Sequence, residues 1–548
     1  MPSIWGALGK GALQDLIGSS VIDRLESILP GLVKDYDDAL LYTKEGLIKV
    51  FDAFFGAAAL LDKEFRTQFF NSLPPGTIDR LLAAAKISAG GLSFEDKIAR
   101  LVKKSWDDGE YAEKAIKLLG LPLDYMPAQK KAFVAQESLL PPESAYKPLK
   151  EYQYPIHEAS IKRLESPRSR FVVQMPTGSG KTRTAIEIIC SFLNASPENT
   201  IAVWLAHSEE LCEQAADSFL EIWPHVAKHE LHLIRCWGSE GKLPAIIKGR
   251  SFIVGGFSKV YGVLAKNPVL IETHRSRVGL VVVDEAHKVI APTYETVARA
   301  FIGDNTSVIG LTATPGRSVS NTEENEELAK FFFMDLLSIQ SGEKPVITYL
   351  REKGVLSHVD YEPLETHRPF ELTSKERSYL EKFYDLPPGF LNRLGNDDVR
   401  NVEIIKKIEK EAEANGRIIF FACSVDHSKF VCAVLKFLGI SAAHIDGDTP
   451  RAQRAASIAA FRSGAIQVLC NYGVLSTGFD APKTDVVFIA RPTQSIVLYS
   501  QMIGRGLRGP AIGGTETCKV IDVVDNIAGF SNQNRVYDYF EEYFDGSK

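Results

Sequence analysis

The stretch Met175-Pro176-Thr177-Gly178-Ser179-Gly180-Lys181-Thr182 decides how this sequence is interpreted. An apolar run, residues 171–173, precedes it, and a segment of helical character, residues 185–189, follows it. Glycines between a strand and a helix let backbone N–H groups turn inward around a polyphosphate, and the helix N-terminus adds partial positive charge. Lys181 can then reach the β- and γ-phosphates, while the hydroxyl of Thr182 can ligate Mg²⁺. The stretch therefore predicts nucleotide binding and hydrolysis.

Composition excludes several classes of protein. At 548 residues, the chain is long enough for about three or four domains. Its formal net charge of -6 excludes a global basic field, so any nucleic-acid surface is a local groove. Its seven cysteines form no C-x-x-C pair, which indicates buried, reduced thiols. The N-terminus lacks a signal-peptide layout and the early apolar run 53–61 is too short to span a bilayer, so we expect a cytoplasmic protein without membrane contact.

Helical spacing of apolar residues runs through residues 1–125. Apolar side chains recur three and four positions apart in 22–29 and 78–82, and Ser93 with Asp96 is typical of a helix N-cap. No group of residues in this region resembles a catalytic site. We expect an all-α accessory or partner-binding domain over 1–125, followed by a proline-containing linker over 126–150.

From about residue 150, short apolar runs alternate with amphipathic segments. The runs are 201–205, 252–254, 280–283 and 308–311, and then 418–421, 466–469, 486–489 and 520–523. Continuous apolar strands separated by helices predict parallel sheets covered on both faces. We therefore predict an α/β domain over 151–320, a charged helical connector or insertion over 321–415, and a second α/β domain with a C-terminal tail over 416–548.

Two adjacent carboxylates, Asp284 and Glu285, end the apolar run that begins at residue 280. Side by side at a strand end they repel each other, and a bound cation relieves that repulsion. Asp284 can hold the Mg²⁺ shell, and Glu285 can orient or deprotonate the attacking water. The pair therefore predicts an ATPase with Mg²⁺ held by Thr182 and Asp284.

At this point the chain resembles the superfamily 2 helicases and translocases of the DEAH type. The matching motifs, in order, are 180–182 (GKT), 205–211 (LAHSEEL, motif Ia), 284–287 (DEAH), 311–317 (LTATPGR, motif III), 421–424 (FACS, motif IV), 475–482 (LSTGFDAP, motif V) and 501–508 (QMIGRGLR, motif VI). The resemblance covers about 150 to 525. It implies two tandem RecA-like domains with ATP in the cleft between them, preceded by the all-α region.

The resemblance also implies a role for each matched residue. The implied catalytic residues are Lys181, Asp284, Glu285, Gln501, Arg505 and Arg508. The implied nucleotide-binding residues are Pro176, Thr177, Gly178, Ser179, Gly180, Lys181, Thr182, Gly478 and Asp480. The residues implied to contact nucleic acid or to couple it to hydrolysis are His207, His287, Thr312, Thr314 and Thr477.

Motif VI has a physical rationale of its own. An arginine supplied across an interface stabilises the charge that develops on a transferred phosphate. Arg505 and Arg508 are three positions apart, so on a helix they share one face, with Gln501 one turn earlier. We expect this face to meet the phosphate loop.

Two positions depart from the family pattern. The glutamine that reads adenine in the family is displaced here, and both Gln153 and His157 are candidates. In place of the usual motif Ib threonine the chain has Gly255 and Gly256, which either admit a phosphate or form a plain turn.

The expected function is an ATP- and Mg²⁺-dependent motor on nucleic acid. The wording of motifs III and V is similar to RadD-like repair ATPases and restriction-system motors, which favours DNA over RNA. The RadD-like resemblance lacks a cysteine-rich zinc module after motif VI. Three alternatives stay open: an RNA helicase, a duplex translocase that separates no strands, and an ATP-switched subunit of a repair or phage-defence complex recruited through residues 1–125.

Overall fold

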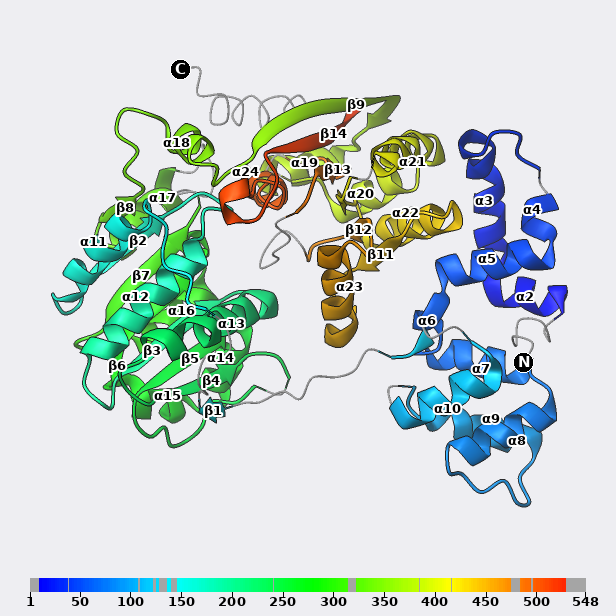
Figure 1. The fold of residues 1–548 in the computed structure, drawn as a ribbon, viewed down its shortest axis with the longest axis horizontal. Coiled ribbons are helices and arrows are strands. Elements are labelled where there is room, and N and C mark those ends of the chain that lie inside the picture. The colour runs from blue at the N-terminus through cyan, green and yellow to red at the C-terminus, as the bar shows by residue number, and fades with distance from the viewer. Residues whose placement is uncertain are drawn as a thin grey trace.

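The computed structural model describes residues 9–37, 39–106, 109–121, 125–127, 136–138, 145–239, 241–313, 322–383, 385–414, 416–474, 483–493 and 496–528. Two sheets, each flanked by helices, lie beside an all-α region (Figure 1). The prediction of two tandem α/β domains behind an all-α N-terminal region is confirmed.

The first sheet has eight strands in the order β1-β4-β5-β3-β6-β7-β2-β8. Neighbours are parallel except β1 with β4. Every residue of β3 and β7 is buried, as expected for strands covered on both faces. The strands are β1 (Gln136–Ser138), β2 (Arg170–Gln174), β3 (Ile201–Ala206), β4 (His232–Cys236), β5 (Ser251–Gly256), β6 (Val278–Asp284), β7 (Ser307–Thr312) and β8 (Leu336–Ser338). The helices are α11 (Tyr154–Leu164), α12 (Lys181–Ala195), α13 (Glu209–Val226), α14 (Phe257–Lys266), α15 (Pro268–Arg275), η2 (Ala286–Lys288), α16 (Pro292–Phe301), α17 (Thr322–Phe331) and α18 (Val346–Glu352).

The second sheet has six parallel strands in the order β11-β12-β10-β13-β14-β9. The strands are β9 (His358–Glu371), β10 (Ile418–Phe421), β11 (Ala442–Ile445), β12 (Val468–Asn471), β13 (Val486–Ile489) and β14 (Thr517–Ala528). The helices are α19 (Ser374–Phe383), α20 (Pro388–Gly395), α21 (Asp398–Glu413), α22 (Val425–Phe437), α23 (Arg451–Ser463), α24 (Ile496–Ile503) and η3 (Pro510–Ile512).

The segment 321–415, expected as a charged helical connector, also supplies one strand to each sheet. β8 pairs with β2 at the edge of the first sheet, and β9 pairs with β14 at the edge of the second. Edge strands have neighbours on one side only and can carry polar residues. Neither strand therefore shows the continuous apolar run on which the prediction depended.

The N-terminal helices are docked on the domain of the second sheet. α3 (Ser19–Leu32) packs on α21, α5 (Lys44–Phe54) packs on α22, and their apolar side chains share one core with the second sheet. The guanidinium carbon of Arg24 is 3.5 Å from the ring centroid of Phe430, and its Nε is 3.1 Å from Oδ1 of Asp398. Phe54 meets the same ring edge-on, with centroids 6.2 Å apart.

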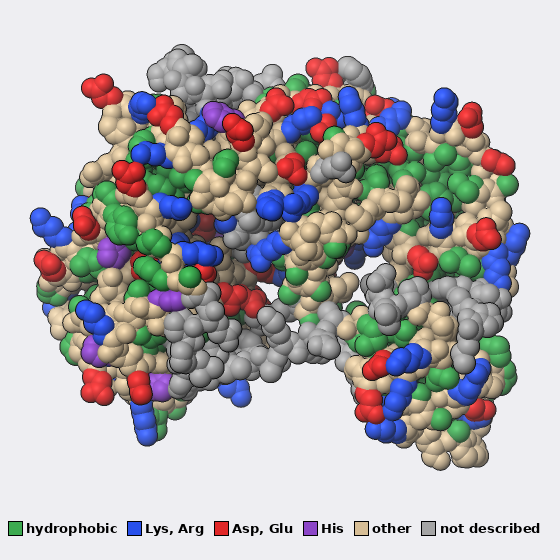
Figure 2. Space-filling view, in the orientation of Figure 1, with side chains coloured by type: hydrophobic (Ala, Val, Ile, Leu, Met, Phe, Trp, Pro, Cys, Tyr) green, Lys and Arg blue, Asp and Glu red, His purple; other side chains and the backbone are tan. Residues whose placement is uncertain are grey.

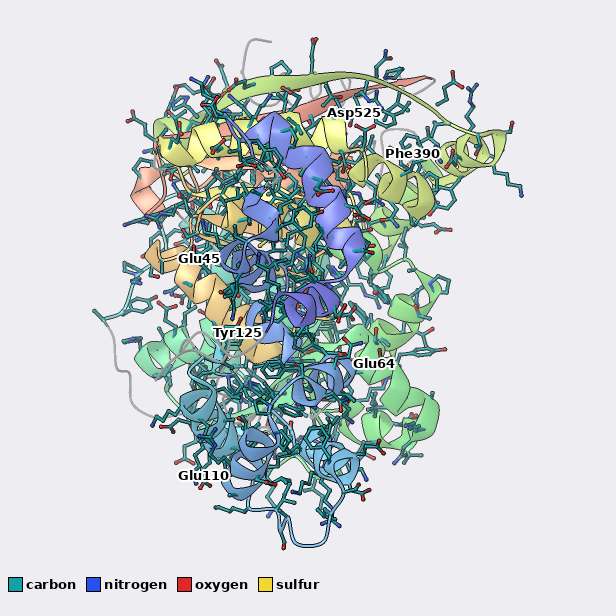
Figure 3. All side chains as sticks on the ribbon, turned by 90° about the vertical axis from the view of Figure 1, so that its right-hand side faces the viewer. Glu45, Glu64, Glu110, Tyr125, Phe390 and Asp525 are labelled. Atoms are coloured by element: carbon teal, nitrogen blue, oxygen red, sulfur yellow. The ribbon has the colours of Figure 1, made fainter. Side chains whose placement is uncertain are left out.

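Two further helices, over residues 10–17 and 39–42, pack on α5, and the N-terminal helices from residue 56 onward form a lobe that extends away from the second sheet (Figure 1). They pack on one another, and in Figure 3 Glu110 marks the lower end of this lobe, far from Asp525 in the second sheet. Trp106 Nε1 donates to the carbonyl of Tyr125 at 3.2 Å, and the Tyr125 hydroxyl donates to Asp52 at 2.5 Å, which ties the end of the region back to α5. The remaining helices are α2 (Lys10–Ile17), α4 (Ala39–Tyr42), α6 (Gly56–Ala59), α7 (Lys63–Asn71), α8 (Pro75–Ala84), α9 (Phe94–Lys103) and α10 (Gly109–Leu119).

Two local predictions are confirmed. Ser93 caps α9, because its Oγ accepts the N–H of Asp96 at 3.1 Å. All seven cysteines are buried and free. Among the residues that the structure describes, none of the helices has the length and apolar content that crossing a membrane requires.

Candidate active site

The phosphate loop connects β2 to α12 with the shape that its glycines predict. Gly178 and Gly180 have φ of 85° and 84°, in the left-handed region that favours glycine. The N–H of Met175 donates to the carbonyl of Thr312 at 3.0 Å, which fastens the loop to the end of β7. α12 begins at Lys181, so its first N–H groups, which have no acceptor within the helix, point toward the loop. The backbone therefore fits a polyphosphate.

The Gln153 side chain stabilises this loop through hydrogen bonds. Its side chain is buried, and its Nε2 donates to Oγ1 of Thr184 at 2.9 Å and to the carbonyl of Gly180 at 3.3 Å. Its Oε1 accepts the N–H of Lys150 at 2.7 Å. A Cβ at Gly180 would lie 2.6 Å from the Gln153 amide nitrogen, so the close approach of Gln153 requires glycine at position 180.

The other candidate for adenine recognition lies on the same helix one turn later. His157 Nε2 is 2.9 Å from Oγ of Ser191 on α12. Burial lowers the pKa of His157 against the attraction of Glu187. The imidazole therefore links α11 to α12, while the Gln153 amide lies at the loop.

Gly255 and Gly256 have packing reasons for being glycine. A Cβ on Gly255 would lie 3.0 Å from Val260 Cγ2, and one on Gly256 would lie 3.2 Å from Trp237 Cβ. Both positions are at the end of β5. The structure thus favours close packing between β5 and its neighbours over the two alternatives that the sequence left open.

The carboxylate pair meets the lysine of the phosphate loop. Lys181 Nζ is 3.6 Å from Asp284 Oδ1 and 3.4 Å from Glu285 Oε1. β6 ends at Asp284, and Glu285 has φ 54° and ψ 59°, a left-handed conformation. Such a conformation costs a non-glycine residue roughly 1–2 kcal/mol, and strain of this kind gathers at functional sites.

The charges of this cluster are incompletely balanced. Burial raises the pKa of Asp284 to about 6, against the attraction of Lys181. Burial opposes ionisation of Glu285 as well, but Lys181 and His287 outweigh it and lower that pKa to about 2. For Lys181, burial and the charge of Arg505 lower the pKa, and the two carboxylates raise it by more. One lysine thus serves two buried carboxylates, which is a setting that a divalent cation completes.

Two histidines flank the pair. His287 Nδ1 is 3.5 Å from Glu285 Oε2. Burial, followed by the charge of Lys288, lowers the pKa of His207 to about 4, and Glu285 and Lys181 also act on it. His207, which the resemblance assigns to nucleic-acid contact, therefore lies on the carboxylate side of the site.

The second domain reaches the phosphate loop at Gly504. A Cβ on Gly504 would lie 2.2 Å from Cγ2 of Thr177. A Cβ on Gly178 would lie 3.9 Å from the carbonyl oxygen of Gly504 and 3.9 Å from Cγ of Arg508. The chain that follows α24 therefore lies directly on the phosphate loop of the first domain.

The helical argument for the arginine pair is wrong, although both arginines lie near the loop. α24 ends at Ile503, so Arg505 and Arg508 lie in the turn and bridge that follow it. Arg505 Nε donates to the carbonyl of Gln501 at 3.1 Å. The helix gives way to a tight turn at Gly506, where a Cβ would lie 2.1 Å from Cys518 Sγ.

Some of the predicted residues cannot be placed in this site. Thr314, Thr477, Gly478 and Asp480 lie outside the described residues. Thr312 is the last residue of β7 and is fully buried. Among the described residues, no group of three or more His, Cys, Asp or Glu side chains could hold a metal alone. A Mg²⁺ ion at Thr182 and Asp284 would thus need phosphate oxygens and water as further ligands, as is usual for this ion.

The sequence did not indicate an ion pair that joins the two domains away from the loop. The Arg454 guanidinium of α23 pairs with the Glu210 carboxylate of α13. The same guanidinium donates to the carbonyl of Thr449 at 3.3 Å. Glu210 lies within motif Ia, but no pattern in the sequence links it to Arg454, because the two residues are distant in sequence and meet only when the domains are adjacent.

Comparison with known proteins gives the class of the chain. A family model described as "Type III restriction enzyme, res subunit" matches residues 146–317, and one described as "Helicase conserved C-terminal domain" matches residues 400–509. These segments contain the phosphate loop with its carboxylates and the chain around Gly504. The two matched segments lie in the first and second α/β domains, and the chain is similar to superfamily 2 helicases and to restriction motors. Similarity to these two families and to proteins named as ATP-dependent helicases points to an ATP-dependent helicase or translocase core within residues 146–509.

Individual relatives are similar over about two thirds of the chain. The 51.5 kDa protein of Lactococcus phage (isolate 7-9) is 26% identical over 379 residues, which cover 68% of this chain and 70% of that protein. IRC3 of Saccharomyces cerevisiae, named as an ATP-dependent helicase, is 25% identical and covers 69% of this chain. The chain spans 51% of that protein and 58% of the mitochondrial irc3 of Schizosaccharomyces pombe, which is 26% identical.

A solved structure supports the fold. A Dbp5 variant of S. cerevisiae bound to RNA and ADP–BeF3 aligns with a TM-score of 0.50 and 18% identity, over 72% of this chain and 88% of that one. The tandem RecA-like architecture is therefore established for both sheets.

Proposed function

We propose that the chain is a DNA-stimulated ATPase that moves along a strand, with hydrolysis in the cleft between the two domains. The observation that carries the proposal is the position of Gly504 on Thr177, which brings the arginines of the second domain to the phosphate loop. An ATP site shared by two domains converts hydrolysis into relative movement of those domains.

The first domain supplies the phosphate and water chemistry. Lys181 exchanges its two carboxylate partners for the β- and γ-phosphate oxygens. Thr182 and Asp284 would hold Mg²⁺, which would neutralise phosphate charge when bound. Glu285 orients the attacking water and accepts its proton. Because Lys181 is the main cause of the low pKa of Glu285, its transfer to the phosphates makes Glu285 more basic when it is needed.

The second domain supplies positive charge to the transferred phosphate. Arg505 follows Gly504, which lies on Thr177 of the phosphate loop, and its charge contributes to lowering the pKa of Lys181, which the two carboxylates raise by more. Arg508 approaches the loop at Gly178. Arginines in this position stabilise the transition state and have little effect on ground-state binding.

Domain movement then couples hydrolysis to the strand. Loss of the γ-phosphate releases the arginines, and the cleft opens at Gly504 and at the Arg454–Glu210 ion pair. The segments of motif Ia at His207 and motif V at Thr477 contact the backbone of the strand. Because such contacts go mainly to phosphates, affinity should depend strongly on salt and weakly on sequence.

Two observations support DNA as the nucleic acid. The family model that matches the first domain is named for a restriction enzyme, while two relatives named as RNA helicases, from Mycobacterium tuberculosis and Candida albicans, cover 60% and 62% of this chain. Although the net charge is -6, Lys and Arg side chains gather over the junction of the two domains near α23 and α24 (Figure 2). This is the local basic surface that a strand requires.

One observation favours a second role for the N-terminal region. α3 and α5 carry the docking on the second domain, whereas α8, α9 and α10 pack on one another and on α7. The outward lobe is therefore the surface through which a protein partner of a repair or defence complex would bind. A pull-down with the full chain and with a chain that carries charge reversals on α10 tests this role.

The test of the motor function is the ATPase rate with single-stranded, double-stranded and forked DNA and RNA. Stimulation by DNA over RNA supports the proposal, and stimulation by RNA alone replaces it with an RNA helicase. Strand-separation and triplex-displacement assays then distinguish an unwinding enzyme from a duplex translocase. An ATPase rate that no nucleic acid changes contradicts the motor function.

A further inference from the structure

The segment that connects the two domains touches both halves of the site. It comprises residues 353–357, between α18 and β9. Gly354, with φ 64°, turns the chain at the end of α18. Val355 and Leu356 are each 2% exposed and Ser357 is fully buried. Residues 355–357 of the connector are thus part of the packed interior and cannot move without displacing their neighbours.

Backbone hydrogen bonds join the connector to the chain that carries the arginines. The N–H of Ser357 donates to the carbonyl of Leu507 at 2.9 Å, and the N–H of Gly509 donates to the carbonyl of Val355 at 2.8 Å. These bonds lie on either side of Arg508. The connector and the arginine segment therefore move as one unit.

The Ser357 hydroxyl fixes the peptide group of Arg508. Its Oγ is 2.6 Å from the carbonyl oxygen of Arg508 and 2.6 Å from that of Thr515. A hydroxyl has one proton, so it donates to one of these carbonyls at a time. The Arg508 carbonyl also accepts the N–H of Thr515 at 2.9 Å. Removal of the hydroxyl therefore takes away one of two donors at that carbonyl and a buried donor at the Thr515 carbonyl, which weakens the hold on the backbone from which the arginine projects.

Leu356 connects the same segment to the phosphate loop. Its Cδ2 lies 3.3 Å from the position that a Cβ on Gly178 would take. It also forms an antiparallel bridge with Arg508. A shift of the loop at Gly178 therefore displaces Leu356. Because Leu356 is bridged to Arg508, Arg508 is displaced with it.

We propose that Ser357 and Leu356 are positioning residues for the arginine pair. They set where Arg508, and Arg505 before it, lie relative to the phosphate loop, so the connector transmits the state of the loop to the second domain. This inference rests on the proposed function, in which these arginines stabilise the transferred phosphate.

The test compares the full-length protein with its Ser357→Ala and Ser357→Thr variants. Affinity is measured for Mg·ADP and for Mg·ADP with aluminium fluoride, a mimic of the transferred phosphate, together with kcat for ATP. Ser357→Ala is expected to bind Mg·ADP normally but to lose about 10- to 100-fold in analogue affinity and kcat, and Ser357→Thr to recover most of that loss. Ser428→Ala is the matched control, since it removes a buried hydroxyl bonded to His444 at 2.8 Å. This control should leave the affinity ratio, which is the affinity for the analogue complex divided by the affinity for Mg·ADP, unchanged.

A double-mutant cycle with Arg508→Ala separates positioning from general packing. In the Arg508→Ala background, where only Arg505 is left to be positioned, Ser357→Ala and Leu356→Ala should cause a smaller loss of analogue affinity than in the wild-type background. Equal losses in both backgrounds overturn the inference, as does a Ser357→Ala variant with the wild-type affinity ratio. A wild-type protein that hydrolyses no ATP contradicts the proposed function instead, so the two failures are distinguishable.

Discussion

Gly504 of the second domain lies so close to Thr177 of the phosphate loop that a Cβ on Gly504 would come within 2.2 Å of Thr177 Cγ2. Gly504 does not have a positive φ, so glycine is required there by contact and not by backbone conformation. The two domains therefore meet at the phosphate loop itself, where a Cβ on Gly504 would overlap the Thr177 side chain.

Gly504→Ala should uncouple the domains. The added methyl group forces the turn away from Thr177, so we expect kcat for ATP to fall at least tenfold while Mg·ADP affinity stays within about twofold. Steady-state hydrolysis and nucleotide titration measure the two effects. Thr177→Ser removes the nearest atom and should restore part of the activity, and a Gly504→Ala variant with normal kcat refutes the contact as a requirement.

Glu285→Gln should bind ATP but not hydrolyse it. The amide keeps the shape of the side chain but cannot accept a proton, so we expect kcat to fall about 10²- to 10⁴-fold with ATP affinity kept. Lys181→Ala is the contrasting variant, because it loses the phosphate contact and leaves Asp284 and Glu285 without their lysine, so both ATP affinity and turnover should be lost. Retained hydrolysis in the Glu285 variant removes Glu285 as the base.

The local chemistry of the site could be predicted from the sequence. The phosphate loop, Asp284 and Glu285 lie in short segments whose function depends on neighbours in the chain, and the structure brings them together with Lys181. We expected the motif VI arginines to lie near the phosphate loop, but the prediction that a helix carries them is wrong. The helix ends before them because Gly504 and Gly506 pack closely against other segments, and residue spacing does not reveal such packing.

Contacts between distant segments could not be predicted. β8 and β9 are edge strands without a continuous apolar run. Ser357 is an ordinary serine in the sequence, and only the fold shows that its hydroxyl meets the carbonyl of Arg508. Arg24 and Asp398 are likewise joined only by docking of the N-terminal helices.

Asp522 should make stability depend on pH. Burial raises its pKa to about 7, only partly offset by the Tyr499 hydroxyl, which donates to Asp522 Oδ2 at 3.1 Å. The contribution of this group to stability is full below its unfolded pKa of about 4 and is lost as pH rises through about 7. Asp522→Asn cannot ionise, so its stability relative to wild type should rise from about pH 5 to pH 8, by roughly 1.4 kcal/mol per unit of pKa shift. A stability difference that is constant over this range, measured by thermal unfolding, contradicts the assignment.

The docking of the N-terminal helices should respond to Arg24. Arg24→Ala removes the contact with the Phe430 ring and the ion pair with Asp398. The side chains of Arg24 and Asp398 are 25% and 31% exposed, so the ion pair is partly shielded from water. We therefore expect the free energy of unfolding to fall by about 1–2 kcal/mol. Arg80→Ala is the matched control, because its contacts with Gly76 and Thr77 stay within α8. Equal effects of the two substitutions, or additivity of Arg24→Ala with Asp398→Ala, argue against the interface.

The claim that both domains build one γ-phosphate site is tested most directly by Arg505→Ala. The account predicts that kcat with saturating DNA falls by about 10³-fold or more while the dissociation constant for ATP stays within about twofold. Arg505→Lys, which keeps the charge without the planar fork, should be intermediate. A kcat for Arg505→Ala equal to that of the wild type would contradict the account.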